Sequence, residues 1–434
     1  MNRRHFLQTS LLAGAAPFVR GAEQGKFRTA LIGCGWWGKN ILREALGSGR
    51  CKIVALADVD ANALEVAGEQ VNDLSGDTPK PYRDYRELLA KEKPEVVIIA
   101  TPDHWHALNT INALKTGAHV FVEKPTGHTV NESRAMLRAA RESGRIVQVG
   151  LHRRIGPHHV SGMKFLKSGA VGEVGMVRLF AYDSGGGIEK PSPNEAAPAS
   201  MDWNMWCGPA PLRPFSKKLH PGGWRNFLDY ANGTLGDWGA HWLDQVLWWS
   251  GEQYPKRISC SGGRPISGTP VLNEKEQTSD VPDHQVATYD FEKFTCVWEH
   301  RRFGSADNEQ HRIGSYYYGT KGTLHIGWRD GWTFYPANKG GKMEYEDSQL
   351  QEPDGHNIKL LWADFVESID QHRPPAAGIE LAHRSSVLPL LGMISWRIGR
   401  SVAWDGAKEQ ITGDPEANAL LARPYRTPWV YPAV

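Results

Sequence analysis

Residues 29–38 read Thr-Ala-Leu-Ile-Gly-Cys-Gly-Trp-Trp-Gly, and this stretch decides the fold of the N-terminal half. Four residues typical of a β-strand run directly into a glycine-rich turn, and residues 39–46 follow with the composition of a helix. A second apolar run, residues 52–57, ends at Asp58. A strand, a glycine turn, a helix, a second strand and an acid, in this order, form the fingerprint of a dinucleotide-binding βαβ unit.

The three glycines of the turn have separate tasks. Gly33 permits the tight turn, Gly35 lets a pyrophosphate approach the backbone, and Gly38 allows the helix to pack closely. The N-terminus of the helix then meets the phosphates with unpaired N–H groups. Asp58 is placed to bind both hydroxyls of an adenosine ribose and would repel a 2′-phosphate. Because no arginine follows Asp58 immediately, we expect NAD rather than NADP as the cofactor.

Strand and helix signals alternate up to residue 150, which predicts a parallel sheet with helices on both faces, as in a Rossmann domain. Ligands of such sheets bind at the carboxyl ends of the strands, so we expect Thr101, Lys124 and Gln148 to face the cofactor cleft. The expected helices cover residues 61–71, 82–89, 105–116 and 132–143, and the expected strands cover residues 96–100, 119–122 and 146–149.

Length and composition limit the classes of function. The chain has 434 residues, more than one ordinary core accommodates, so we expect two domains. Its 50 lysines and arginines balance 48 acids, which gives no basic footprint for nucleic acid. No stretch of the sequence approaches the roughly 18 apolar residues of a membrane span. The five cysteines form no CxxC pair, which argues against a disulfide framework or a cysteine-based zinc site.

The first 22 residues differ from the rest of the chain. Arg3 and Arg4 precede an uncharged stretch rich in leucine and alanine, residues 11–19. A pair of arginines before a short apolar region is typical of a twin-arginine export signal. We therefore expect residues 1–22 to form a signal segment and the protein to be periplasmic or exported. The alternative is a disordered cytoplasmic tail.

Beyond residue 150 the periodicity changes. Five stretches read as strands, most of them without a helix between them, which predicts a largely antiparallel sheet. The Gly- and Pro-rich residues 184–218 predict a long loop, and such loops in compact domains are usually functional. The expected strands cover residues 174–182, 285–291, 294–300, 312–318 and 323–328, and the expected helices cover residues 160–168, 236–249, 357–370 and 381–401.

Several motifs together resemble a known family. The triplet Glu123-Lys124-Pro125 ends a predicted strand, Thr101-Pro102 precedes His106, and residues 233–241 read Gly-Thr-Leu-Gly-Asp-Trp-Gly-Ala-His. With the glycine turn, these motifs resemble the Gfo/Idh/MocA family of sugar and cyclitol oxidoreductases. Pro125 is expected to shape its loop through a cis peptide bond.

The resemblance implies a fold and an assembly. We expect an α/β protein with an NAD-binding Rossmann domain, residues 27–150. A substrate-binding α/β domain with a large, mostly antiparallel open sheet and C-terminal helices is expected over residues 151–434. Relatives often associate through the open face of this sheet, so we also expect a homo-oligomer.

Three side chains are expected to carry the chemistry. Asp237 and His241 are four residues apart, which on a helix places both on one face. A carboxylate that holds one imidazole nitrogen leaves the other free to accept a hydroxyl proton. We expect His241 as the base, Asp237 as its orienting partner, and Lys124 as the cation that stabilises an alkoxide and anchors the substrate. The family resemblance implies the same three roles. The alternative is that His241 is an ordinary core histidine of an apolar helix.

The other expected site residues follow from the same patterns. Tryptophan rings stack on sugars and arginines bind hydroxyls, although many of the 17 tryptophans are expected in the core. The histidine groups 104/106 and 158/159 fit no zinc spacing, so no metal is expected. The expected cofactor-binding residues are Gly33, Gly35, Trp37, Gly38, Asp58, Thr101, Pro102, His106, Glu123 and Lys124, and the expected substrate-binding residues are Lys124, Arg154, Trp224, Arg225 and His241.

Three functions compete at this point. The first is an NAD-dependent oxidoreductase that acts on a secondary hydroxyl or ketone of a sugar, glycoside or cyclitol, with a tightly bound cofactor that is loaded before export. The second is an NAD-dependent, redox-assisted glycosidase of the same superfamily. The glycine loop of those glycosidases characteristically continues with an arginine, whereas this chain has Trp36-Trp37. The third is a non-catalytic sugar-binding protein.

Overall fold

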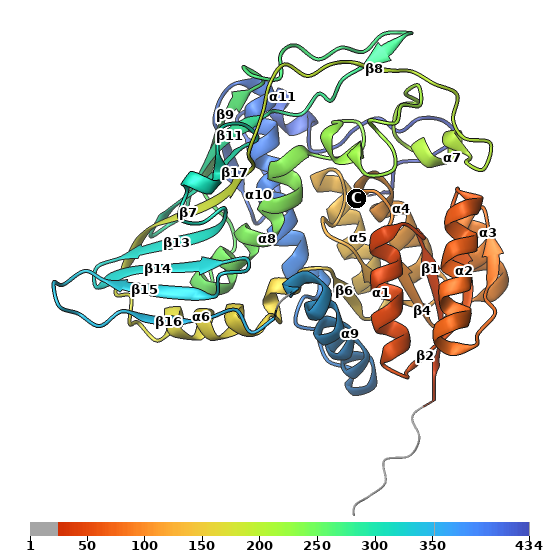
Figure 1. The fold of residues 1–434 in the computed structure, drawn as a ribbon, viewed down its shortest axis with the longest axis horizontal. Helices are drawn as coiled ribbons and strands as arrows, with labels where there is room; N and C mark the ends of the chain where they lie inside the picture. Colours follow the sequence, from red (N-terminus) through yellow and green to blue (C-terminus); the bar gives the residue numbers. More distant parts are fainter. Residues whose placement is uncertain (1–24, 351, 434) are drawn as a thin grey trace, which may run out of the picture.

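The computed structural model describes residues 25–350 and 352–433, and most of them belong to two units, each built on its own sheet (Figure 1). The expected twin-arginine segment, residues 1–22, lies outside the described residues. In the described part of the chain, no helix is both long and apolar enough to cross a membrane.

The first unit is a six-stranded parallel sheet with the order β3-β2-β1-β4-β5-β6. Helices lie on both of its faces, as expected for a Rossmann domain (Figure 1). Its strands are β1 (Phe27–Ile32), β2 (Cys51–Ala57), β3 (Lys80–Tyr82), β4 (Val96–Ile99), β5 (His119–Val122) and β6 (Val147–Val149), and its helices are α1 (Trp36–Gly47), α2 (Ala61–Ser75), α3 (Tyr85–Glu92), α4 (Asp103–Lys115) and α5 (Val130–Ser143).

One local prediction in this unit was wrong. A helix was expected to begin at residue 82, but the chain first forms the short strand β3 and α3 begins only at Tyr85. Proline favours extended backbone in the residue before it, and Pro81 lies in the middle of β3. Asp84 then caps α3, because its side chain accepts the N–H of Arg86.

The second unit is a ten-stranded sheet in which the parallel pair β7·β12 is the exception among antiparallel neighbours. The expected fold class is therefore confirmed. The order is β16-β15-β14-β13-β7-β12-β11-β9-β17-β18, with β7 (Val174–Tyr182), β9 (Arg257–Gly263), β11 (His284–Asp290), β12 (Thr295–Arg301), β13 (Ile313–Gly319), β14 (Gly322–Gly327), β15 (Trp332–Pro336), β16 (Glu344–Glu346), β17 (Val402–Asp405) and β18 (Gln410–Thr412).

Four longer helices accompany this sheet, and two of them join the units. Trp362 packs against Phe121 of β5, so α9 covers the first sheet although it lies late in the chain. The helix α10 packs against α8, α5 and β9, and this central position explains why its residues are apolar on most sides (Figure 1). The four helices are α6 (Pro157–Lys167), α8 (Gly233–Ser250), α9 (Pro353–Gln371) and α10 (Ile379–Ile398).

The second half of the expected long loop and the residues that directly follow it reach across to the first unit. We call residues 200–226 the crossing segment; it includes α7 (Trp203–Cys207), which lies above the first unit in Figure 1. The N–H of Ala61 donates to the Ser200 carbonyl at 3.0 Å, and the N–H of Asp202 donates to the Val59 carbonyl at 2.9 Å. The crossing segment is thereby tied to the turn after β2.

The contact between Gly38 and the glycine turn gives a test of this fold. A Cβ on Gly38 would lie 2.0 Å from the carbonyl oxygen of Gly33. We expect Gly38→Ala to lower the free energy of unfolding by about 1–3 kcal/mol and to weaken NADH binding. Urea unfolding and NADH fluorescence titration measure the two effects.

Gly47 of the same helix is the matched control, because a Cβ there would meet no atom within 4 Å. Gly47→Ala should leave both quantities unchanged or raise stability slightly. Equal behaviour of the two variants would contradict the packing argument.

Candidate active site

A cavity of about 360 Å³ runs along the carboxyl edge of the first sheet. Residues after β1, β2 and β4 form one side of it, and Met205, Trp206 and Trp224 of the crossing segment form another. The strand order of the sheet reverses between β1 and β4, and dinucleotides bind at this switch point in Rossmann sheets.

The glycine turn beside this cavity leaves room for a phosphate. Gly33 has a φ of +95°, and a Cβ there would lie 2.7 Å from the carbonyl carbon of Ala100. By contrast, a Cβ on Gly35 would meet no protein atom within 4 Å. The helix α1 begins at the next residue, and no described side chain caps it. Its free N–H groups and the open space beside Gly35 fit the pyrophosphate of NAD.

Asp58 lines the same cavity at the end of β2. Its carboxylate accepts the N–H of Asp60 at 2.9 Å and the N–H of Cys34 at 2.6 Å. Burial raises the pKa of Asp58, and these hydrogen bonds oppose the rise. The cavity also contains Arg83, which donates to the backbone carbonyl of Val59. Arg83 was not predicted, because it follows β3 and is separated from Asp58 by α2 in the sequence.

A second cavity, of about 230 Å³, adjoins the first, and the two share Trp36, Trp37, Ala100, Thr101, Trp224 and Arg225. Lys124, Asp237 and His241 all line this second cavity. The structure thus brings together the three side chains expected to carry the chemistry: Lys124 from the turn after β5, and the other two from α8.

Lys124 and Asp237 form an ion pair in this cavity. The ammonium group of Lys124 contacts the Asp237 carboxylate and also donates to the Asp237 backbone carbonyl at 3.1 Å. Burial alone would raise the pKa of Asp237, but the charges of Lys124 and Arg225 lower it below its usual value. Asp237 is therefore a carboxylate, and it holds Lys124 in place. The peptide bond between Lys124 and Pro125 is cis, as expected.

His241 does not have the partner that the sequence suggested. Its Nδ1 is buried without a hydrogen-bond partner in the described chain, whereas the Asp237 carboxylate contacts Lys124. Asp237 therefore does not orient His241, because the nearby ammonium group attracts the carboxylate. Burial, reinforced by the charges of Arg153 and Lys124, lowers the pKa of His241 well below its usual value. His241 is consequently neutral at neutral pH, with an unpaired ring nitrogen.

Two buried carboxyl groups in this cavity titrate near neutral pH. Burial raises the pKa of Glu123 to about 7 and the pKa of Asp103 to about 7, in both cases against the charge of Lys124. A Cβ on Gly150 would lie 2.4 Å from Glu123 Oε2, so the absence of a side chain there makes room for this acid. Asp103 was not predicted, although it directly follows the Thr101-Pro102 motif.

The other expected cofactor residues lie around the two cavities, with different functions. Thr101 and Trp37 line both cavities, and Pro102 lines the first. His106 contacts the carbonyls of Pro125 at 2.7 Å and Thr101 at 2.8 Å, so it mainly ties the turns after β4 and β5 together.

The expectation for Gln148 was wrong. Gln148 is fully buried and donates to the Leu361 carbonyl of α9 at 3.3 Å. Since α9 comes from the C-terminal half, nothing in the local sequence indicated that it would cover this end of β6.

Arg154 also differs from its prediction. Its guanidinium forms two hydrogen bonds with Asp244, at 2.8 and 2.9 Å, and it lines neither cavity. The neighbouring Arg153 lines the second cavity instead, with its guanidinium between the rings of Trp238 and Trp242. Arg153 and Arg154 belong to the 3₁₀ turn His152–Arg154, which directs successive side chains to different sides. Arg153 therefore faces the second cavity and Arg154 does not.

Trp224 and Arg225 are placed as expected, since both line the two cavities. Arg225 stacks on the ring of Trp224 at 4.2 Å, and its Nε lies 3.8 Å from the Asp237 carboxylate. The crossing segment therefore contributes an aromatic ring and a cation at the junction of the cavities.

Known proteins resemble this chain along much of its length. The solved structure of levoglucosan dehydrogenase, in complex with NADH and levoglucosan, superposes with a TM-score of 0.65 at 19% identity. The superposition covers 87% of this chain and 99% of that one, which shows a shared fold.

Two curated relatives match shorter regions. Inositol 2-dehydrogenase of Rubrobacter xylanophilus is 35% identical over 122 residues, which is 28% of this chain and 33% of the relative. A glycosyl hydrolase family 109 protein of Shewanella pealeana is 26% identical over 202 residues, or 40% of this chain and 44% of the relative. The matches thus span less than half the length of these relatives.

Two family models match the chain in its two units. The model described as the oxidoreductase family with an NAD-binding Rossmann fold matches residues 27–151. The model for the C-terminal α/β domain of the same family matches residues 180–262 and 335–431. The chain therefore belongs to the Gfo/Idh/MocA family of oxidoreductases.

Proposed function

We propose that the protein is an NAD-dependent oxidoreductase that acts on a secondary hydroxyl or ketone of a sugar, glycoside or cyclitol. One observation carries the proposal: the cavity at the switch point of the first sheet adjoins a second cavity whose wall holds Lys124, Asp237 and His241. A cofactor with its pyrophosphate at Gly35 would extend toward this junction. The names of the relatives, which include an inositol dehydrogenase and a levoglucosan dehydrogenase, support this class of substrate.

Each side chain has its own role in the proposed reaction. NAD, when bound, supplies the hydride acceptor. His241 is neutral because burial and the nearby cations lower its pKa, and its unpaired ring nitrogen is placed to accept the hydroxyl proton as negative charge develops beside Lys124. Lys124 holds the hydroxyl oxygen and stabilises the negative charge that develops on it. Asp237 fixes the position of the Lys124 ammonium group.

The first experiment is a near-ultraviolet titration of the purified protein with sugars, glycosides and cyclitols, without added nucleotide. A reduced-nicotinamide band that appears on titration supports a dehydrogenase half-reaction with retained NAD. If added NAD also gives no band with any of these compounds, the proposal fails for this substrate class.

The base is tested by His241→Asn. We expect kcat to fall by about 10²- to 10⁴-fold, because the hydroxyl proton loses its acceptor, while NADH affinity stays the same. Initial rates at 340 nm and NADH fluorescence measure the two quantities. His356→Asn, an exposed histidine on α9, is the control and should behave like the parent. An unchanged kcat in His241→Asn would assign the base to another group.

The preference for NAD over NADP is supported by the Asp58 carboxylate in the first cavity. We expect Asp58→Asn to weaken NAD⁺ binding by roughly tenfold or more, since a hydrogen bond to a charged group is lost. NADP⁺ binding should weaken less or improve, because the charge that repels a 2′-phosphate is removed. Calorimetric titration of nucleotide-free protein with both nucleotides measures the ratio.

Asp77→Asn is the matched control for this experiment. Asp77 also accepts a backbone N–H of β2, at Ile53, but it does not line the cavity. The control should leave the NAD⁺/NADP⁺ ratio unchanged. A ratio equally unchanged in Asp58→Asn would refute the role of this carboxylate.

We also propose that the cofactor stays bound between turnovers. The crossing segment covers the first cavity and is tied to the turn after β2 by the Ala61–Ser200 and Asp202–Val59 hydrogen bonds. Nucleotide release requires this cover to open. Retention would suit a protein that receives its cofactor before export, and the Arg3-Arg4 segment motivates that localisation.

Ala61→Pro tests this cover with little disturbance elsewhere. Ala61 is the first residue of α2, where proline is tolerated, and the preceding residue Asp60 is extended. The variant removes only the N–H that is donated to Ser200, so we expect NADH to dissociate roughly fivefold faster. Stopped-flow displacement measures the rate. Ala61→Ser keeps the N–H and should release NADH like the parent; equal rates in all three proteins would show that the cover does not retain the cofactor.

The redox-assisted glycosidase is the second candidate, and the match to a glycosyl hydrolase family 109 protein favours it. A screen with chromogenic glycosides separates the two enzymes. Aglycone release that depends on bound NAD and does not accumulate NADH would support hydrolysis. Absence of any turnover in both assays, together with sugar binding, would leave the non-catalytic binding protein.

A further inference from the structure

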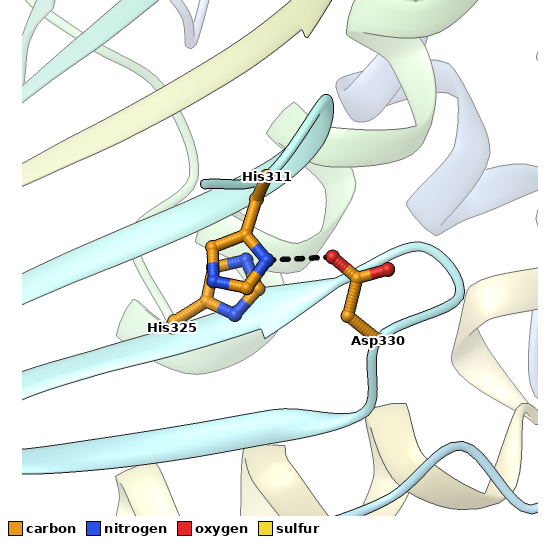
Figure 2. A group of neighbouring side chains, drawn as sticks. All are labelled: His311, His325 and Asp330. Atoms are coloured by element: carbon orange, nitrogen blue, oxygen red, sulfur yellow. Dashed lines mark hydrogen bonds and ion pairs between the residues drawn. The ribbon is translucent and has the colours of Figure 1, made fainter. Parts of the chain in front are cut away.

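Three potential metal ligands meet on the second sheet, away from both cavities. His311 precedes β13, His325 lies on β14, and Asp330 belongs to the turn between β14 and β15 (Figure 2). Leu324 and Ile326 belong to the core beneath the helices, so His325 between them faces the opposite side of the sheet. Figure 2 shows the two imidazole rings stacked, with the Asp330 carboxylate beside them.

Three of the four imidazole nitrogens in this group have no hydrogen-bond partner in the described chain. His325 is fully buried, and neither of its ring nitrogens has a hydrogen-bond partner in the described chain. The Nε2 of His311 is likewise buried without one, while its Nδ1 contacts Asp330 Oδ2 at 2.6 Å. Buried polar atoms without partners are costly. A ligand that accepts these lone pairs would remove that cost.

The chemistry of the three side chains suits a cation. Neutral imidazoles and carboxylates are the states in which these residues bind metals, and the contact between His311 and Asp330 places such a pair beside His325.

The backbone leaves space around the group. A Cβ on Gly314 would lie 3.0 Å from His325 Nε2, and a Cβ on Gly327 would lie 3.0 Å from the Asp330 Cβ. Side chains at either glycine would therefore crowd the three ligands. One ligand atom from each residue lies within 4.8 Å of the other two.

We propose that His311, His325 and Asp330 bind a divalent transition-metal ion such as Zn²⁺. Two imidazoles and one carboxylate form a nitrogen and oxygen set that suits Zn²⁺ and its neighbours in the first transition row. The ion takes the place of the proton between His311 Nδ1 and Asp330 Oδ2, and that proton moves to His311 Nε2. The ion also takes one nitrogen of His325, and water completes the coordination.

The rings must turn for this to happen. Their centroids are 3.5 Å apart with an interplanar angle of 16°, an arrangement in which the lone pairs run side by side. The terminal torsion of histidine is broad, so the torsion itself opposes such a rotation only weakly.

The site has a structural consequence for the second cavity. Trp328, two residues before Asp330, packs edge-on against Trp238, with ring centroids 5.1 Å apart. Its Nε1 also donates to Asp354 Oδ1 at 3.2 Å. Trp238 and Asp354 line the second cavity. A metal ion that holds the β14–β15 turn therefore also fixes Trp328 behind the wall of this cavity.

Metal binding to the full chain is the test. Chelator-treated protein is titrated with Co²⁺, followed by its visible absorption, and with Zn²⁺ in competition with a chromogenic chelator. We expect one tight equivalent and a melting temperature that rises with Zn²⁺ concentration. Asp330→Asn and His311→Gln should each weaken Zn²⁺ binding at least about tenfold, since even outer partners of metal ligands contribute this much.

His356→Gln is the matched control, because this exposed histidine lies on α9 outside the group. It should bind Zn²⁺ like the parent. Asp330 is partly exposed, so Asp330→Asn is expected to fold even if a substitution of the buried His325 would prevent folding. NADH binding by Asp330→Asn checks that the variant is folded. Absence of a tight equivalent in the parent, or equal affinity in the parent, Asp330→Asn and His311→Gln, would overturn the proposal and leave a stacked pair of histidines with bound water.

Discussion

The ion pair between Lys124 and Asp237 joins the two units at the reacting end of the cleft. Lys124 follows β5 of the first sheet, and Asp237 lies on α8, the helix that also carries His241. Farther along α8, Asp244 is held by Arg154, with side chains 1% and 8% exposed. Because a buried charge that loses its partner is costly, α8 cannot slide without breaking both pairs. His241 lies between them on the helix, so both ion pairs restrain the segment of α8 that carries it, while its ring packs near His152 and Trp238.

The second cavity contains both histidines whose pKa is lowered and a carboxyl group whose pKa is raised. Burial near Lys124 and Arg153 keeps His241 neutral, and the pKa of His152 is lowered to about 4. Burial raises the pKa of Glu123 to about 7 even though Lys124 opposes the rise. Near neutral pH, the histidines therefore keep one protonation state while the carboxyl group changes its own. A pH dependence of the reaction in this range would then arise from the acids.

Most of the first unit could be predicted from the sequence, because its signals are local. The glycine turn and the strand 119–122 need only neighbouring residues, and β5 has the predicted bounds. The strand β17 was missed. The predicted helix ran to residue 401, whereas Gly399, with a φ of +66°, ends α10 at Ile398 and lets the strand begin at Val402. The sequence predicted which residues form the site better than it predicted their contacts. Lys124, Asp237 and His241 line one cavity, but the Asp237 carboxylate contacts Lys124 and not His241.

Contacts between distant segments could not be read from spacing. Arg154 and Gln148 were expected in the cleft, yet each found a partner far along the chain, Asp244 and the Leu361 carbonyl. The expectation of no metal considered only histidines close in sequence, so it did not examine the group for which we propose a metal ion. His311 and His325 are 14 positions apart, and the pairing of β13 with β14 folds the chain back so that their rings stack. A local spacing rule cannot detect side chains that a hairpin brings together, whereas the paired strands and the buried nitrogens without partners draw attention to them.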